Sequence, residues 1–375
     1  MSSRNKIVLT GATGYVGGTV LDHLIKDTSQ SLKDVAIDVL VRKEGQAEKL
    51  REAYKDRIGT ILWKGLTDEE FIINTAANYD IVINAGSGFF PAGAAAFVEG
   101  LARRVKNGER APWMIHIAGC TNLSDLPITG KAYPDREWDD ADGNAIYEFL
   151  KSEDEKSPYL QRTAEVAVLT RAEETGVQAV SLNTPGIYGL GTGLFNQAGL
   201  VIPSGLRYVI TRGYGRKVID TTSFDLVHVE DLADLYILLI RAILEREDRG
   251  VGFIPSGKNG IIFPAVLRAS SIEIMQLCLD AAFEEGVLPR EDTPKEKEIR
   301  RVTLKQMADE VTFGMQEVAE RLVGHKAQKG TVAKRLLGWE PKRLDEAWKQ
   351  DFKDELLALR AGKRGKIGDG AIGLN

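Results

Sequence analysis

A glycine-rich turn near the start of the chain constrains the fold more than any other feature. The segment TGATGYVG at residues 10–17 has the spacing GxxGxxG. It follows the apolar run Lys6–Thr10 and precedes a helical pattern over Gly18–Lys26. A strand, a glycine turn and a helix in this order are typical of a dinucleotide site, because backbone N–H groups and the helix N-terminus bind pyrophosphate. The alternative is a turn that only connects strand to helix.

Each glycine of this turn has a separate expected role. Gly11 makes the tight turn, Gly14 lets phosphate approach the backbone, and Gly17 lets the helix pack on the strand. The other turn residues expected at the cofactor are Thr13, Tyr15 and Val16.

The second predicted strand indicates which dinucleotide binds. Its end reads Val41-Arg42-Lys43, with no carboxylate before Glu44. A carboxylate there would accept a hydrogen bond from the 2′-hydroxyl of NAD, whereas bases accommodate the 2′-phosphate of NADP. Arg42 and Lys43 therefore favour NADP(H) over NAD(H), unless they are only surface bases at a sheet edge.

Apolar runs of strand length alternate with amphipathic stretches along the first half of the chain. This alternation predicts an α/β fold, a doubly wound parallel (Rossmann) sheet, with a smaller C-terminal substrate lobe. We expect a Rossmann domain at 1–185 to which 220–245 returns, a substrate-binding lobe at 186–360 and a frayed tail at 361–375. The expected strands are Lys6–Thr10, Ala36–Val41, Thr60–Trp63, Asp80–Ala85, Trp113–Ala118 and Gln178–Asn183, with a further one at Val251–Ile254. We expect the acidic, turn-rich stretch 123–157 to have irregular structure.

Composition narrows the class of protein. The net charge of −5 gives no general attraction to nucleic acid, and two cysteines in 375 residues suggest a reducing compartment without disulfides. With no signal-like or membrane-spanning apolar run, we expect a cytoplasmic protein without a membrane partner. A small-molecule substrate is the expected partner, and a homodimer is left open. The four histidines form no metal-spacing cluster with cysteines or carboxylates, so no metal is expected.

The sequence resembles the extended or atypical short-chain dehydrogenase/reductase superfamily, the epimerase/dehydratase-like type, whose fingerprint is TGxxGxxG. Further motifs of that superfamily follow in order: GLTD at 65–68, NAG at 84–86, PGIYG at 185–189, VHVEDLA at 227–233 and LLGWEP at 336–341. The first departs from the usual GDLTD, since its first Asp is missing. A nearer resemblance is to fungal NAD(P)-binding proteins, through IHIAGC at 115–120 and IYGLGTGLFN at 187–196. The resemblance adds cofactor contacts at Leu66, Ala85, Gly86, Pro185 and Ile187.

The resemblance also implies a proton-transfer pair, a Tyr with a Lys four residues later, in which the ammonium lowers the pKa of the phenol. Tyr147 and Lys151 have this spacing but lie early in the sequence relative to Pro185. Tyr159 and Arg162 lie in the right place, but their spacing is three and arginine replaces lysine. Both pairs stay candidates, with Arg162 able to hold ribose hydroxyls. Alternatively, Tyr147 and Lys151 are a chance pair on a surface stretch, and Tyr159 is a helix-start residue that packs on the sheet.

A hydroxyl that polarises the substrate carbonyl is expected directly after the fifth strand. Cys120 occupies the expected position and Thr121 follows it. Thr121 donates well and Cys120 weakly, so Thr121 is the preferred candidate. Cys120 could otherwise be a nucleophile or a small buried thiol.

These features predict an NADP(H)-dependent oxidoreductase, a carbonyl reductase or dehydrogenase, that acts on a small organic molecule. The fungal resemblance implies a secondary-metabolite substrate. Two alternatives remain: a redox-neutral epimerase, isomerase or dehydratase of the same superfamily, and a non-enzymatic NmrA-like protein that senses NAD(P). Bases at Arg207, Arg212, Arg216 and Lys217 would suit the diphosphate of a nucleotide sugar, or are simply solvated.

Overall fold

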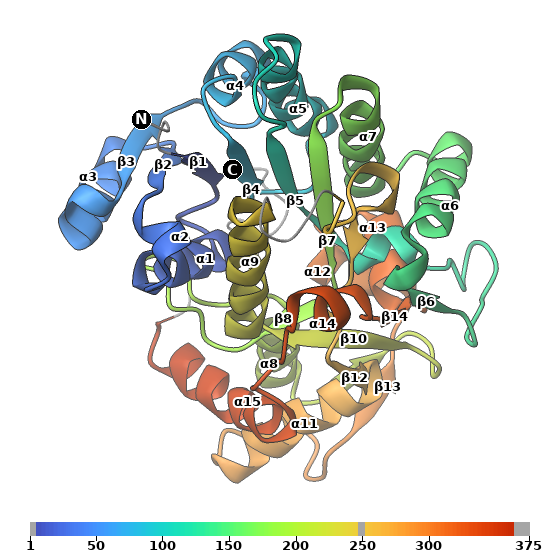
Figure 1. The fold of residues 1–375 in the computed structure, drawn as a ribbon. Helices are drawn as coiled ribbons and strands as arrows, with labels where there is room; N and C mark the ends of the chain where they lie inside the picture. Colours follow the sequence, from blue (N-terminus) through green and yellow to red (C-terminus); the bar gives the residue numbers. More distant parts are fainter. Residues whose placement is uncertain (1–4, 247–251, 364–375) are drawn as a thin grey trace.

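A parallel sheet of seven strands forms the centre of the molecule (Figure 1). The computed structural model describes residues 5–246 and 252–363. The strand order is β11-β7-β5-β4-β1-β2-β3, and every neighbouring pair is parallel. This confirms the predicted doubly wound α/β fold. In chain order the strands are β1 (Lys6–Thr10), β2 (Ala36–Val41), β3 (Gly59–Leu62), β4 (Ile81–Asn84), β5 (Trp113–Gly119), β7 (Gln178–Thr184) and β11 (Ile261–Ile262).

Helices cover both faces of this sheet, which is why its central strands are apolar almost throughout. One face carries α1 (Tyr15–Lys26), α3 (Glu44–Tyr54) and α9 (Val229–Leu244). The other carries α4 (Glu69–Ala76), α5 (Pro91–Lys106), α6 (Gly143–Lys156) and α7 (Leu160–Thr175). Two short elements, α2 (Gln30–Lys33) and the 3₁₀ turn η1 (Lys55–Arg57), connect strands at the periphery.

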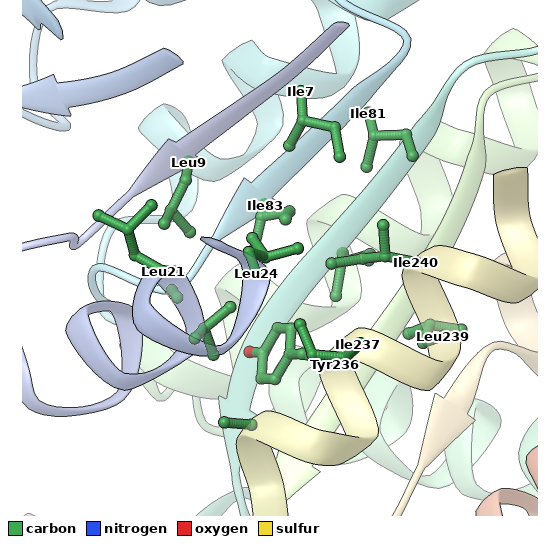
Figure 2. Close-up of a cluster of buried hydrophobic side chains, with 14 of the residues drawn as sticks. Ile7, Leu9, Leu21, Leu24, Ile81, Ile83, Tyr236, Ile237, Leu239 and Ile240 are labelled. Carbon is green, nitrogen blue, oxygen red and sulfur yellow. The ribbon is translucent and has the colours of Figure 1, made fainter. Parts of the chain in front are cut away.

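Helix α9 returns to the sheet after the chain has left it. Figure 2 shows its Tyr236, Ile237 and Ile240 beside Ile7 and Ile83 of the sheet. The apolar stripe of α9 is buried against α1 and the strands, so the first face of the sheet has one continuous core. The exact domain boundaries expected from the sequence stay a prediction.

Two parts of the sequence fold differently from expectation. The last strand of the sheet is Ile261–Ile262, whereas residues 252–254 of the expected strand Val251–Ile254 are not in a strand and residue 251 lies outside the described residues. The acidic stretch expected to be irregular follows the 3₁₀ turn η2 (Cys120–Leu123) and contains β6 (Glu137–Asp139), the 3₁₀ turn η3 (Asp140–Asp142) and the 14-residue helix α6. The buried stripe of α6, which includes Ile146, Tyr147 and Leu150, packs into the apolar core on the sheet face that α4, α5 and α7 also cover.

The later segments build a smaller lobe with its own apolar core. That core lies between α8 (Val201–Arg212), α11 (Ser271–Glu284) and α15 (Asp345–Arg360) and includes Leu206, Leu279 and Phe352. Its three-stranded sheet has the order β12 (Leu267–Ser270), β10 (Ser223–His228) and β8 (Gly186–Tyr188). The other elements of the later segments are β9 (Gly215–Lys217), η4 (Gly257–Asn259), β13 (Ile299–Arg301), α12 (Leu304–Val311), α13 (Gln316–Val323), β14 (Ala327–Lys329) and α14 (Val332–Leu337).

Most of the tail predicted at 361–375, namely residues 364–375, lies outside the described residues. Among the described helices, none combines the length and apolar character needed to cross a membrane.

Candidate functional site

The residues expected at the cofactor and substrate follow the carboxyl ends of parallel strands and so meet at one edge of the sheet. The glycine turn follows β1, Arg42 and Lys43 follow β2, and Leu66 comes after β3. Ala85 and Gly86 follow β4, Cys120 and Thr121 follow β5, and Pro185 and Ile187 follow β7. Ligands of open α/β sheets bind at this edge.

The glycine turn fits a dinucleotide pyrophosphate. Gly11 has φ +79°, and a Cβ on it would lie 2.5 Å from the carbonyl oxygen of Ala85. A Cβ on Gly17 would overlap the carbonyl of Gly11, so both glycines are required for packing. Gly14 differs, because a Cβ there would contact only the Gly11 carbonyl, at 3.1 Å. Gly14 is also the N-cap of α1, and among the described residues no side chain caps this helix. The first N–H groups of α1 can therefore bind an anion.

The segment after β8 packs against this turn. The hydroxyl of Tyr15 donates to the carbonyl oxygen of Gly189 at 2.5 Å. The backbone N–H of Asn196 donates to the backbone carbonyl of Thr13 at 3.4 Å. A Cβ on Gly18 would lie 3.3 Å from the Cα of Gly193. The glycines of this segment therefore allow it to lie close to the start of α1.

The bases after β2 are placed where the sequence predicts them. Both Arg42 and Lys43 are exposed, and Lys43 is the N-cap of α3. A Cβ on Gly65, in the turn after β3, would lie 3.8 Å from Cδ of Arg42. The two basic side chains thus project from the edge where an adenosine 2′-substituent would lie in such folds.

A buried polar chain runs beneath the same edge. Thr10 donates to Oδ1 of Asn84 at 2.8 Å, and Nδ2 of Asn84 lies 3.1 Å from Nδ1 of His116. Burial lowers the pKa of His116 to about 4, so the imidazole is neutral and accepts a hydrogen bond from Asn84. This chain links the ends of β1, β4 and β5.

The end of β5 brings together two sequence-predicted hydroxyl groups. Oγ1 of Thr121 lies 3.2 Å from the hydroxyl oxygen of Tyr159, the N-cap of α7. Thr121 also donates to Oε1 of Gln161 at 2.5 Å. The side chain of Gln161 lies against Gly119 and Gly88, where a Cβ on either glycine would contact it. The sequence analysis missed Gln161, because an amide exchanges no proton and carries no signature of catalysis.

Glu165 connects the elements that carry Thr121 and Tyr159. Its buried carboxylate accepts hydrogen bonds from Asn122 at 2.6 Å, Ser181 at 2.6 Å and Asn183 at 2.8 Å. Burial raises the pKa of Glu165, and the three hydrogen bonds oppose that rise. One side chain therefore connects α7 to η2 and β7, which holds Tyr159 and Thr121 in register.

The environment of the two acidic candidates keeps them protonated. Burial raises the pKa of the Tyr159 phenol, and the hydrogen bond with Thr121 and the charge of Arg321 act in the opposite direction. Burial also raises the pKa of Cys120 to about 11. A buried thiol in this state is a poor nucleophile.

The alternative pair Tyr147 and Lys151 lies elsewhere. Tyr147 is fully buried, and its hydroxyl lies 2.7 Å from Oγ1 of Thr170, whereas Lys151 is exposed. Thr170 is nine residues beyond Gln161 in α7, about 14 Å of helical rise towards the amino end of β7. The two residues are therefore not brought to the carboxyl edge, because Tyr147 belongs to the apolar stripe of α6.

Arg162 turns away from the edge towards the end of α6. One terminal nitrogen donates to the carbonyl oxygens of Glu153 at 2.9 Å and Ser157 at 2.6 Å, and Asp154 lies 3.5 Å from Nε. Both carbonyls lie at the C-terminus of α6, where the Glu153 oxygen also accepts the backbone N–H of Ser157, so Arg162 caps α6. Its expected contact with ribose hydroxyls has no support in this geometry.

The bases of the lobe have acidic or aromatic partners. Arg212 lies 2.8 Å and Arg216 3.6 Å from the carboxylate of Glu310, and Lys217 lies 2.7 Å from Asp220. Within residues 5–246 and 252–363, no group of three His, Cys, Asp or Glu side chains could hold a metal ion.

Comparison with known proteins agrees with this arrangement. The family model described as "NAD dependent epimerase/dehydratase family" matches residues 7–252, more than half of the chain. The chain belongs to this family. The predicted superfamily resemblance is thereby confirmed, and members of the epimerase/dehydratase family are oxidoreductases, epimerases or dehydratases.

One fungal relative and several solved structures are similar to this epimerase/dehydratase family member. Oxidase ucsJ of Acremonium sp is 28% identical over 245 residues, which span 63% of this chain and 66% of the relative. The UDP-glucose 4-epimerase of Thermotoga maritima has a TM-score of 0.58 and 15% identity, covering 96% of this chain and 100% of its own. The yeast methylglyoxal/isovaleraldehyde reductase complexed with NADPH has a TM-score of 0.60 and 15% identity, covering 95% and 99%. At these identities the structural likeness establishes the fold alone.

Proposed function

We propose that the protein is an NADP(H)-dependent carbonyl reductase or dehydrogenase. The observation that carries the proposal is the contact between Thr121 and Tyr159 at the end of β5. A phenol and a hydroxyl 3.2 Å apart can together bind and protonate one carbonyl oxygen.

The proton that the carbonyl oxygen receives comes from a side chain of the protein. The nicotinamide, when bound, supplies hydride to the carbonyl carbon. The raised pKa keeps Tyr159 protonated at neutral pH, so its hydroxyl can donate a proton to the carbonyl oxygen. Thr121 can donate to the same oxygen when its hydroxyl proton turns from Oε1 of Gln161 to the substrate. Hydride on carbon and a proton on oxygen convert a ketone or aldehyde to an alcohol.

Arg42 and Lys43 support NADP(H) as the cofactor. Their exposure beside the turn after β3 leaves them on the adenosine side of the expected site. The yeast reductase binds NADPH, which agrees with this choice, whereas other similar structures contain NAD. The fungal oxidase relative adds support for redox chemistry, and a secondary-metabolite substrate is the corresponding proposal.

The epimerase alternative has weaker support. A nucleotide-sugar diphosphate needs accessible bases, whereas Arg212 and Arg216 share the carboxylate of Glu310. We therefore rank redox turnover above isomerisation.

The test is oxidation of NADPH by the purified full chain, followed by absorbance with a panel of aromatic and aliphatic ketones and aldehydes. We expect consumption of NADPH that requires a carbonyl compound. Tight NADPH binding with no turnover on any carbonyl would contradict the reductase and favour a cofactor sensor. Interconversion of a sugar nucleotide without net oxidation would favour the epimerase.

A further inference from the structure

The C-terminal lobe contributes a charged side chain to the edge of the dinucleotide-binding sheet. Helix α13 packs against η2, the segment directly after β5. Its Arg321 is only 2% exposed, and the guanidinium carbon lies 4.4 Å from the centroid of the Tyr159 ring. A buried cation at this distance from an aromatic face is an attractive contact.

The position of Arg321 is held from both sides of the helix. Glu317, one turn earlier, accepts from Nη2 of Arg321 at 2.9 Å, and its side chain is 50% exposed. Glu320, next to Arg321, accepts from the backbone amides of Ile128 and Thr129 at 2.7 and 2.8 Å. Helix α13 is therefore attached to the segment after η2, and the guanidinium lies between the half-exposed Glu317 and the buried phenol.

No cation of α7 serves the phenol in the described structure. In the family pattern a lysine stands four residues after the tyrosine; here that position is Thr163, whose hydroxyl donates to Asp154 at 2.9 Å. Arg162 caps α6 instead. Arg321 is thus the positively charged side chain over the Tyr159 ring, and it comes from a point more than 150 residues later in the sequence.

We propose that Arg321 is a positioning residue that supplies the positive charge for proton transfer at Tyr159, in place of a lysine on α7. The inference rests on the proposed function. As the proton leaves Tyr159, the negative charge on the phenolate is stabilised by the guanidinium. The lobe therefore completes the proton-transfer site of the other domain.

Several other groups face Tyr159 and enter any pH dependence. Thr121 and Cys120 approach from η2, Glu317 from α13, and Asp154 through the Tyr159 amide at 3.1 Å. The hydrogen bond with Thr121 and the charge of Arg321 lower the pKa of the phenol, whereas Cys120 and Glu317 raise it. Removing Arg321 and removing Glu317 must therefore have effects of opposite sign.

The experiment measures the phenol directly in the full chain. A fluorinated tyrosine incorporated at position 159 titrates in an accessible pH range and is followed by ¹⁹F NMR. We expect R321Q to raise its pKa, R321K to restore most of the difference, and E317Q to lower it. The same label at Tyr147, which is hydrogen-bonded to Thr170, is the matched control and should not move. K334Q on the exposed side of α14 controls for loss of a positive charge.

E317Q keeps the test decisive if R321Q does not fold, because Glu317 is half exposed. A label at position 159 whose titration is unchanged in folded R321Q or in E317Q would overturn the proposal for Arg321. Since this readout needs no substrate, shifts of the expected sign would support it even if no carbonyl compound were turned over. In that case only the reductase function would fail. With a substrate in hand, R321Q should shift the pH profile of kcat; a change in KM alone would instead make Arg321 a substrate anchor and contradict the proposal.

Discussion

The hydroxyl oxygens of Thr121 and Tyr159 lie 3.2 Å apart, although 38 residues separate them in the sequence. If this pair protonates a substrate carbonyl, Y159F should lower kcat by about 10²- to 10⁴-fold and leave NADPH affinity unchanged. T121V should lower kcat by a smaller factor, because the phenol remains. Y147F removes an equivalent hydroxyl from the core and is the matched control. Equal losses in Y159F and Y147F would show that the effect is structural.

Arg42 and Lys43 should determine cofactor preference. A charge-assisted hydrogen bond contributes roughly 1.5–3 kcal/mol, so the double variant R42A/K43A should weaken NADPH binding by about tenfold or more. Affinity for NADH should change little, since it carries no 2′-phosphate. Calorimetric titration of both cofactors measures the difference, with K49A on the exposed side of α3 as control. A wild-type protein that binds both cofactors equally would contradict the assignment.

Substitution of Gly11 should mainly affect folding, whereas substitution of Gly14 should mainly affect cofactor binding. G11A places a Cβ 2.5 Å from the Ala85 carbonyl at φ +79°, so we expect a loss of at least roughly 1–3 kcal/mol in the free energy of unfolding. G14A meets only one carbonyl, at 3.1 Å, and should fold with a smaller loss. Its added methyl group lies where phosphate would approach, so NADPH affinity should fall by about tenfold or more. Urea unfolding and cofactor titration measure both effects. G14A with undiminished affinity would show that the cofactor lies elsewhere.

His116 should make stability depend on pH in the mildly acidic range. Burial lowers its pKa from 6.5 to about 4 in the folded protein. Between these values the unfolded chain binds a proton that the folded chain does not. The contribution is therefore fully present above pH 6.5 and is lost as the pH falls towards 4. NMR titration of the imidazole should show a neutral ring at pH 5, and H116Q should flatten the decline in unfolding free energy. A midpoint near the ordinary value would refute the prediction.

Much of the fold was readable from local patterns. The strands Lys6–Thr10 and Ala36–Val41 agree with the structure residue for residue, because buried parallel strands are short apolar runs bounded by turns. The helix α6 was not predicted. Its buried residues Ile146, Tyr147 and Leu150 are interleaved with polar and acidic residues, and the helical pattern becomes clear only from the apolar core that they pack into. The two-residue strand β11 is too short to have a periodic signal of its own.

The glycine turn was predictable from local sequence alone, because the strand, the tight turn and the helix follow one another directly along the chain. The sequence also indicated the basic side chains after β2. The surroundings of the two tyrosines follow only from tertiary packing, which brings the hydroxyl of Tyr159 to Thr121 and that of Tyr147 to Thr170. Gln161 and Arg321 were likewise decided by packing: their relation to Tyr159 depends on the docking of α7 and α13 at the end of β5, and no spacing along the chain encodes that approach.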